Sequence, residues 1–223
     1  MSEARTEVLR RVRAALRDAP PVGEVVRGYE RRLPVGTVLV ELFANRVADY
    51  RAEVVRTPRS ELAQTISRAL RDRQAKRIAV PPGLPNSWLA EADVQTAEDS
   101  PPLSHTQLDA VDGVVTSCSV AIAETGTIVL DGGPGQGRRA LSLLPDYHLC
   151  IVAEEQIVGT LSEALERLDP RRPQTWISGP SATSDIELQR VEGVHGPRSL
   201  EVLIVRGDPG IESMGAARAK VAG

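Results

Sequence analysis

The sequence AIAETGTIVLDGGPGQGRR, residues Ala121–Arg139, joins two apolar segments to a loop rich in glycine. The segments Val120–Ala123 and Ile128–Leu130 have the character of strands and flank Glu124–Thr127, so a local antiparallel hairpin is predicted here. Four glycines then fall within the six residues 132–137. Glycine makes turns that other residues rarely adopt, and the N–H groups of such loops can approach an anion closely. The stretch therefore predicts a functional site within a folded domain.

On both sides of this stretch, strand-like and helix-like segments alternate along the chain. Strands are expected at residues 77–81, 94–97, 113–116, 149–153, 175–178 and 200–205. Helices are expected at residues 2–17, 38–51, 58–72, 86–92, 106–110 and 161–168. The helix at 58–72 has Thr57 as its expected cap and Pro58 as its first residue. The alternation predicts an α/β fold with a mostly parallel sheet that is covered on both faces.

The length and composition indicate an ordinary soluble protein. With 223 residues the chain suits one α/β domain with a small extension, and its core needs no disulfide or metal to hold it. We expect an N-terminal helix and linker at residues 1–34, the α/β domain at 35–207 and a C-terminal tail at 208–223. Only 3% of the residues are aromatic and the net charge is -3, which argues against a nucleic-acid partner.

No segment of the sequence indicates a membrane or an export signal. No apolar run approaches the roughly 20 residues that cross a bilayer. The first 19 residues are charged and amphipathic and lack the apolar centre of a signal peptide. We therefore expect a cytoplasmic protein without a membrane span.

The cysteines and histidines offer no metal site. Cys118 and Cys150 are the chain's two cysteines, too few for a disulfide framework, an iron–sulfur cluster or a structural zinc site. His105 and His148 have no partners at the spacing of metal ligands. We expect no metal and no cofactor bound by this chain.

The glycine loop approaches two known phosphate-binding patterns and fits neither. After Gly132, four residues and Gly137, a P-loop would continue with Lys and then Ser or Thr, but Arg138 and Arg139 stand there. The Mg²⁺-binding hydroxyl is therefore missing. The glycine spacing, with Gly133 and Gly135, also departs from the dinucleotide-binding pattern. An anion-binding turn assisted by Arg138 and Arg139 and a plain surface loop both remain open.

Three further groups of residues are candidates for chemistry. Glu124 follows an apolar strand and could act as a general base or nucleophile, or serve as a hydrogen-bonding strut or an exposed charge. Ser181, Thr183 and Ser184 follow a strand and could open a helix that holds an anion, although such residues also cap helices. His195 lies between glycines, where it could be an acid, a base or an ordinary surface residue.

Three segments taken together resemble the LUD-domain family, in the lactate utilisation protein C (YkgG-like) branch. They are AIAETGTIVL with GGPGQGRRALSLLPDYH, then SGPSATSDIE, then GVHGPRSLEVLIV, and they keep that family's order between residues 121 and 205. The resemblance marks ten signature positions as site candidates. These are Glu124, Thr125, Gly126, Thr127, Gly135, Gly137, Ser181, Asp185, Glu187 and His195.

The resemblance also implies a fold and a function. The fold would be an α/β/α sandwich similar to that of sugar-phosphate isomerases and coenzyme A transferases. The function would be a part in oxidising L-lactate to pyruvate with two iron–sulfur partner proteins, which would hold all the clusters. On this hypothesis Arg138 and the segment Ser181–Asp185 hold a small carboxylate, while Glu124 and His195 handle a proton.

Two other functions remain open at this point. Coenzyme A transferases of the related fold use a glutamate at a strand end as nucleophile, and Glu124 with Gly126 looks similar. The chain would then be a stand-alone acyl or coenzyme A transferase, or a ligase. The third hypothesis is a scaffold or regulator without catalysis.

Overall fold

The computed structural model describes residues 3–17, 28, 31–183, 191–192 and 196–207. The chain divides into two units, Met1–Glu30 and Arg31–Gly223. The first contains the helix α1 (Glu3–Ala15), which begins with an acidic residue and carries apolar residues at helical spacing. The second contains the α/β fold. The predicted tail at 208–223 lies outside the described residues.

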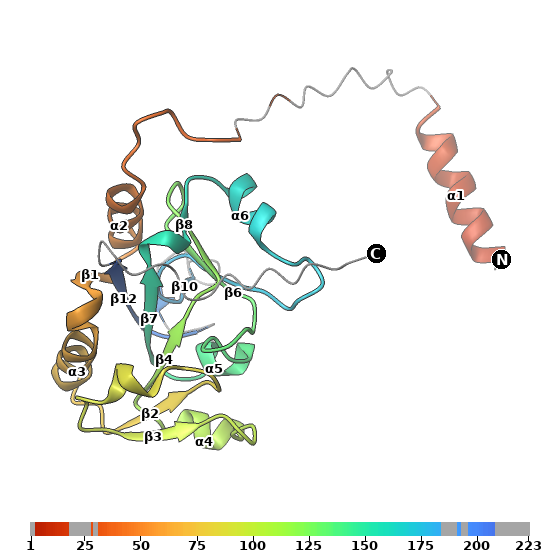
Figure 1. Cartoon of the computed structure of the whole chain (residues 1–223). Coiled ribbons are helices and arrows are strands. Elements are labelled where there is room, and N and C mark those ends of the chain that lie inside the picture. The colour runs from red at the N-terminus through yellow and green to blue at the C-terminus, as the bar shows by residue number, and fades with distance from the viewer. Residues whose placement is uncertain (1–2, 18–27, 29–30, 184–190, 193–195, 208–223) are drawn as a thin grey trace, which may run out of the picture. The chain divides into compact units, whose positions relative to one another are not determined.

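A parallel sheet of six strands forms the centre of the second unit (Figure 1), with the order β1-β12-β7-β4-β2-β3. Its strands are β1 (Glu53–Pro58), β12 (Ser199–Arg206), β7 (Tyr147–Ala153), β4 (Gly113–Ser117), β2 (Arg77–Val80) and β3 (Gln95–Glu98). Every pair in this sheet is parallel. Strands buried on both faces are apolar along their whole length, as β7 is. The predicted α/β class with a mostly parallel sheet is confirmed.

Helix α3 (Leu62–Asp72) covers one face of this sheet. Its residues Leu62, Ile66 and Leu70 lie on one side at helical spacing and pack against Leu149 and Leu203. The short helices η1 (Arg59–Glu61) and η2 (Asn86–Leu89) flank α3.

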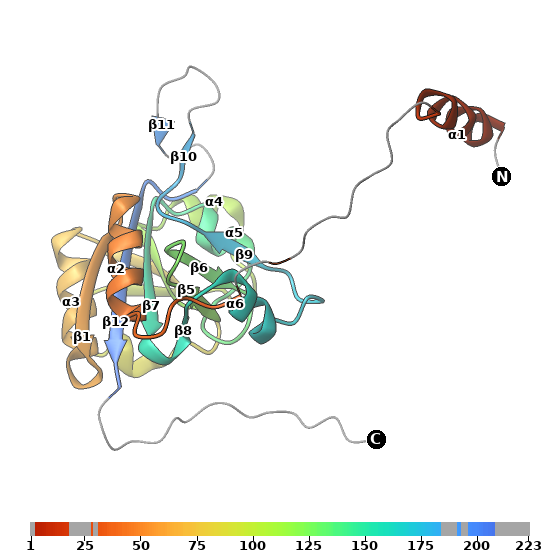
Figure 2. The same ribbon diagram turned by 90° about the horizontal axis from the view of Figure 1, so that it is seen from above.

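The opposite face is covered by a second, four-stranded sheet with the order β8-β5-β6-β9. Its strands are β8 (Ile157–Val158), β5 (Val120–Ile122), β6 (Thr127–Leu130) and β9 (Thr175–Ile177). Ala121 and Ile128 face the central sheet, whereas Val120 and Val129 face α6 (Leu161–Arg167). The hairpin is thus buried on both sides, which explains its unbroken apolar sequence. Figure 2 shows α3 and α6 on opposite sides of the central sheet.

Helix α2 (Leu39–Asp49) and five short elements complete the described part of the second unit. Helix α2 packs through Phe43 and Val47 into the core between the two sheets. The other elements are α4 (His105–Asp109), α5 (Arg139–Leu143), η3 (Glu154–Gln156), β10 (Ala182–Thr183) and β11 (Val191–Glu192). Strands β10 and β11 form an antiparallel pair.

Two local predictions were wrong. Thr57 and Pro58 do not start a helix, because they pair with Val205 and Arg206 as the last residues of β1. The helix begins only at Leu62. The segment after Ser181 does not open a helix either, since Ala182 and Thr183 form β10.

Candidate functional site

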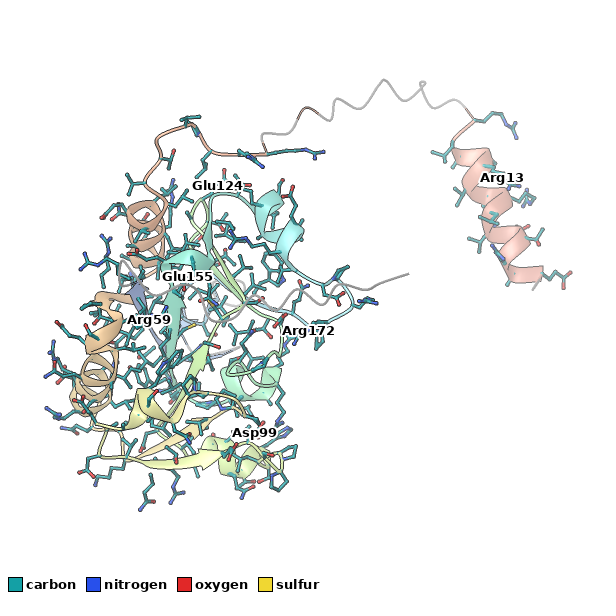
Figure 3. The ribbon with its side chains drawn as sticks, in the orientation of Figure 1. Arg13, Arg59, Asp99, Glu124, Glu155 and Arg172 are labelled. Carbon is teal, nitrogen blue, oxygen red and sulfur yellow. The ribbon has the colours of Figure 1, made fainter. Side chains whose placement is uncertain are left out.

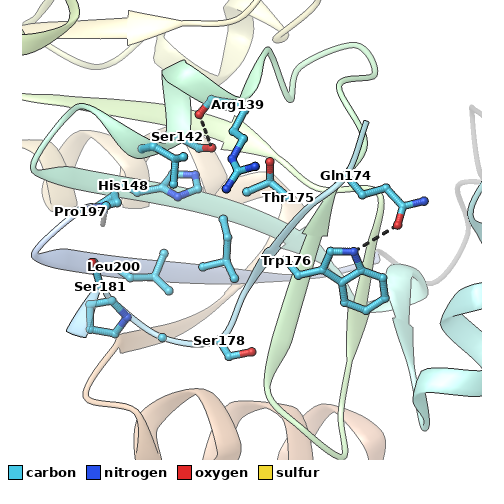
Figure 4. A pocket seen from close by; sticks show the side chains of 15 residues that line it. Arg139, Ser142, His148, Gln174, Thr175, Trp176, Ser178, Ser181, Pro197 and Leu200 are labelled. Carbon is cyan, nitrogen blue, oxygen red and sulfur yellow. Dashed lines mark hydrogen bonds between the residues drawn. The ribbon is translucent and has the colours of Figure 1, made fainter. Parts of the chain in front are cut away.

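A cavity with a mixed polar and apolar wall lies where β9 passes over α5 and the first residues of β7 and β12 (Figure 4). Its volume is about 480 Å³. The wall is made by Arg139, Ser142, Leu143, His148, Gln174, Thr175, Trp176, Ile177, Ser178, Gly179, Pro180, Ser181, Gly196, Pro197 and Leu200. We call it the β9 pocket.

Arg139 is the one charged side chain among the described residues of the β9 pocket. It is the first residue of α5, and its guanidinium makes no hydrogen bond or ion pair with any described residue. The Ser142 hydroxyl donates to the Arg139 carbonyl oxygen at 3.3 Å, which secures the first turn of α5. Figure 4 shows the Arg139 side chain reaching into the pocket beside Thr175. Among the described residues, the Arg139 guanidinium at this pocket therefore has no anionic partner.

The neighbouring Arg138 is already engaged. Its guanidinium donates to both carboxylate oxygens of Asp99, at 2.8 and 3.0 Å, and to the Leu103 carbonyl oxygen. The Asp99 side chain is only 4% exposed. The carboxylate of Asp99 raises the pKa of Arg138. In this structure Arg138 ties α5 to the segment before α4, and the anion expected at Arg138 is a protein carboxylate.

His148 forms part of the pocket wall from β7 and is buried. Its Nε2 lies 2.7 Å from the Thr116 hydroxyl. Burial lowers the pKa of His148 to about 4, so the ring is neutral at neutral pH. Sequence reasoning missed His148 as a site residue. The available signal was a histidine inside an otherwise apolar strand, YHLCIVA.

The segment Glu124–Thr127 reaches the β9 pocket through hydroxyl groups. The Thr125 and Thr127 hydroxyl oxygens lie 2.7 Å apart, and the Thr127 hydroxyl lies 2.8 Å from the Ser178 hydroxyl in the pocket wall. Glu124 itself is exposed, with its N–H donating to the Gly159 carbonyl oxygen. Figure 3 shows Glu124 and Asp99 at opposite ends of the α/β unit. The structure thus brings the two threonines, but not the glutamate, toward the pocket.

Gly126 has a packing role in the same segment. Its φ is +61°, and a Cβ there would lie 2.8 Å from the backbone carbonyl carbon of Arg46 in α2. Only glycine lets α2 approach the hairpin turn this closely.

The glycine loop is fastened to the carboxyl ends of β2 and β4. The Gly135 N–H donates to the Pro82 carbonyl oxygen at 2.9 Å, and its own carbonyl oxygen accepts from the Ser117 N–H at 2.7 Å. The Gly133 N–H donates to the Asp131 carboxylate at 3.1 Å. The N–H groups that an anion would use are therefore partly engaged within the protein. Gly137 and Arg138 line an adjoining pocket of about 450 Å³, which shares Arg139 with the β9 pocket.

The other predicted residues are placed as follows. Ser181 lines the β9 pocket, and its N–H donates to the Pro197 carbonyl oxygen at 2.8 Å. Thr183 belongs to β10. The positions of Ser184, Asp185, Glu187 and His195 lie outside the described residues.

No metal site is found in the described part of the chain. No three of its His, Cys, Asp or Glu residues come together as metal ligands would. The Cys150 thiol and burial raise the pKa of Cys118 well above its usual value, so this thiol stays protonated. None of the described helices has both the length and the apolar character to cross a membrane.

The sequence and the fold are similar to those of known proteins. Residues 40–205 match the family model of the LUD domain. The chain is 46% identical over 209 residues to "Lactate utilization protein C" of Deinococcus radiodurans, which covers 92% of this chain and 96% of that protein. It is 34% identical over 106 residues to the protein of the same name from Shouchella clausii, and this match covers 44% of this chain and 46% of that protein. A crystal structure of a DUF162 family protein from Deinococcus radiodurans has a TM-score of 0.64 and 43% identity, covering 75% of this chain and 96% of that one.

Proposed function

The chain belongs to the LUD-domain family, and we propose that it is the component without clusters in a system that oxidises L-lactate to pyruvate. One observation carries this proposal. The similarity to a lactate utilisation protein C extends over 92% of the chain, so it includes most of the α/β unit rather than a single motif.

The proposed partners are two iron–sulfur proteins. Oxidation of lactate releases a pair of electrons, which need an acceptor. The chain has two cysteines, whereas a cluster needs about four cysteine ligands. Both thiols, Cys118 and Cys150, are buried in the core between the two sheets. This supports the assignment of the electron carriers to other proteins.

The proposed ligand is a small carboxylate. The β9 pocket supports it, because a pocket of this size suits a small molecule and Arg139 supplies a cation. Ser181, one of the family's signature positions, lies in its wall. The proton-handling role of Glu124 and His195 and the anion-holding role of Arg138 stay predictions, with Arg138 already paired to Asp99.

Acyl transfer through Glu124 has less support. The carboxylate is exposed at the turn of a hairpin, and Glu124 is not among the residues that line the cavities near α5 and β9. A nucleophilic glutamate needs a substrate held beside it.

Growth on L-lactate tests the proposal. Deletion of the gene in its host should abolish growth on L-lactate and leave growth on pyruvate intact, and a plasmid copy should restore it. A tagged chain purified from lactate-grown cells should carry two further proteins and iron. Normal growth of the deletion strain on L-lactate would contradict the proposed function, and capture of the bare chain would contradict the proposed partners.

A further inference from the structure

The β9 pocket has the charge of a site for a monoanion. Its described wall contains one cation, Arg139, and no carboxylate. The other arginine of the pair, Arg138, is neutralised by Asp99, and nearby Arg172 is neutralised by Asp131 at 2.9 Å. A ligand with a single negative charge would balance Arg139, whereas a nucleotide or coenzyme A would bring several charges to one cation. A carboxylate carries one charge and accepts two parallel hydrogen bonds from a guanidinium group.

The polar groups beside Arg139 suit a second oxygen on the ligand. His148 is neutral, so the imidazole in the wall does not add a second positive charge to the pocket. The hydroxyl-bearing residues Ser142 and Thr175 lie in the same part of the wall, shared with the adjoining pocket. Figure 4 shows Arg139, His148 and Thr175 around one end of the pocket. A carboxylate at Arg139 would therefore have hydrogen-bonding groups near its C2 substituent.

The rest of the wall is apolar. Leu143, Ile177 and Leu200 enclose the pocket together with Pro180 and Pro197. These side chains suit a hydrocarbon group and offer nothing to a second charge. A volume of about 480 Å³ is far more than a three-carbon acid fills, so the wall does not restrict the ligand to a methyl group.

From this arrangement we propose that the β9 pocket binds short-chain 2-hydroxy or 2-oxo monocarboxylates, with the carboxylate on Arg139 and the carbon chain against Leu143, Ile177 and Leu200. The site accepts chains longer than that of lactate. This assignment rests on the proposed function, and it names the substrate class and the residue that anchors it.

Titration of the purified full chain tests the assignment. L-lactate, pyruvate, 2-hydroxybutyrate and 2-oxobutyrate are titrated by calorimetry, with propionate as the acid that lacks a C2 oxygen. Arg139→Gln should weaken binding by about tenfold or more, as expected for loss of a charge-assisted hydrogen bond. Arg68→Gln is the matched control, because Arg68 is an exposed arginine of α3 on the other face of the central sheet. It should bind as the wild type does.

Four results of the carboxylate titrations would overturn the assignment. These are no binding of any of the four acids by the wild-type chain, equal affinity in the two variants, propionate binding as tightly as pyruvate, and four-carbon acids being excluded. If inorganic phosphate binds more tightly than the four acids, and this binding depends on Arg139, the assignment of the ligand as a carboxylate is overturned. The deletion strain separates the two proposals: loss of growth on L-lactate without binding to the purified chain refutes the site and leaves the function standing.

Discussion

Replacing Arg138 with Gln should destabilise the protein without weakening carboxylate binding, and replacing its neighbour Arg139 should do the reverse. The two residues are adjacent in sequence, but their guanidinium groups differ in surroundings. Arg138 donates two hydrogen bonds to Asp99 and one to Leu103, whereas Arg139 has no described partner. The first is a strut by geometry, and the second is the anchor of the proposed site.

The expected loss of unfolding free energy follows from the hydrogen bonds that Asp99 keeps in the Arg138→Gln variant. Asp99 would keep only the Leu103 N–H, which donates to it at 2.7 Å, and its carboxylate is 4% exposed. Breaking a fully buried ion pair costs about 3–5 kcal/mol. Arg138 is 35% exposed, so water screens part of the interaction and the loss is reduced to about 2–3 kcal/mol. For a unit of this size the melting temperature should fall by roughly 5–10 °C.

Urea unfolding followed by tryptophan fluorescence measures the loss, because Trp88 and Trp176 both belong to the α/β unit. Arg139→Gln and Arg68→Gln should unfold within about 0.5 kcal/mol of the wild type, as surface substitutions do. The reasoning is refuted if Arg138→Gln is as stable as these controls, or if it loses carboxylate affinity while keeping full stability.

Three further predictions concern groups outside that pair. Gly126→Ala should lower the free energy of unfolding by about 2–4 kcal/mol in the same assay, because the φ of Gly126 is +61° and the new Cβ would lie 2.8 Å from the Arg46 carbonyl carbon. A loss below about 1 kcal/mol would mean that α2 and the turn separate easily. Burial lowers the pKa of His148 to about 4, so between pH 6.5 and pH 4 the unfolded chain binds a proton at this residue and the folded chain does not. The free energy of unfolding should therefore fall by about 3 kcal/mol as the pH is lowered from about 6.5 to about 4. The free energy of unfolding of His148→Gln should lack that part of the pH dependence. If the unfolding free energies of the variant and the wild type change equally with pH, the prediction is wrong. The Glu201 carboxylate accepts a hydrogen bond from the Tyr147 hydroxyl at 2.8 Å, and burial raises the pKa of Glu201. Its contribution to the free energy of unfolding is therefore present at low pH and is lost as the pH rises through the pKa of the folded state. Glu201→Gln should therefore be at least as stable as the wild type at pH 8, and a clear loss there would show that the charged form is the favoured one.

The sequence was informative about elements whose pattern is local. The hairpin of β5 and β6, helix α6 and the buried strand β7 follow from short-range periodicity and are confirmed. Strand β1 was missed, because its pairing partner β12 lies more than a hundred residues later in the chain. Thr57 and Pro58 satisfy the local rules for a helix start, yet the parallel ladder holds them extended. The packing of the hairpin as a second sheet is equally non-local, since it depends on α6 covering its outer face.

The site shows the same division between local and non-local information. Ser181 was a candidate from its own segment and from the family pattern, and it lines the β9 pocket. His148 and Thr175 come from β7 and β9, which only the fold brings together. No spacing in the sequence could have joined them to Arg139. Such residues become visible as a site only through the cavity that they share.

The fold also suggests what the glycine-rich loop does for the pocket. Its N–H and carbonyl groups tie residues 133–136 to the carboxyl ends of β2 and β4. The Arg138 side chain pairs with Asp99 and does not line the β9 pocket. Because the hydrogen bonds of residues 133–136 hold the loop backbone, Arg139 extends into the β9 pocket from a fixed position. If the proposed site is correct, the sequence GGPGQGRR contributes to it by positioning the cation of Arg139, without contact between the loop backbone and the ligand.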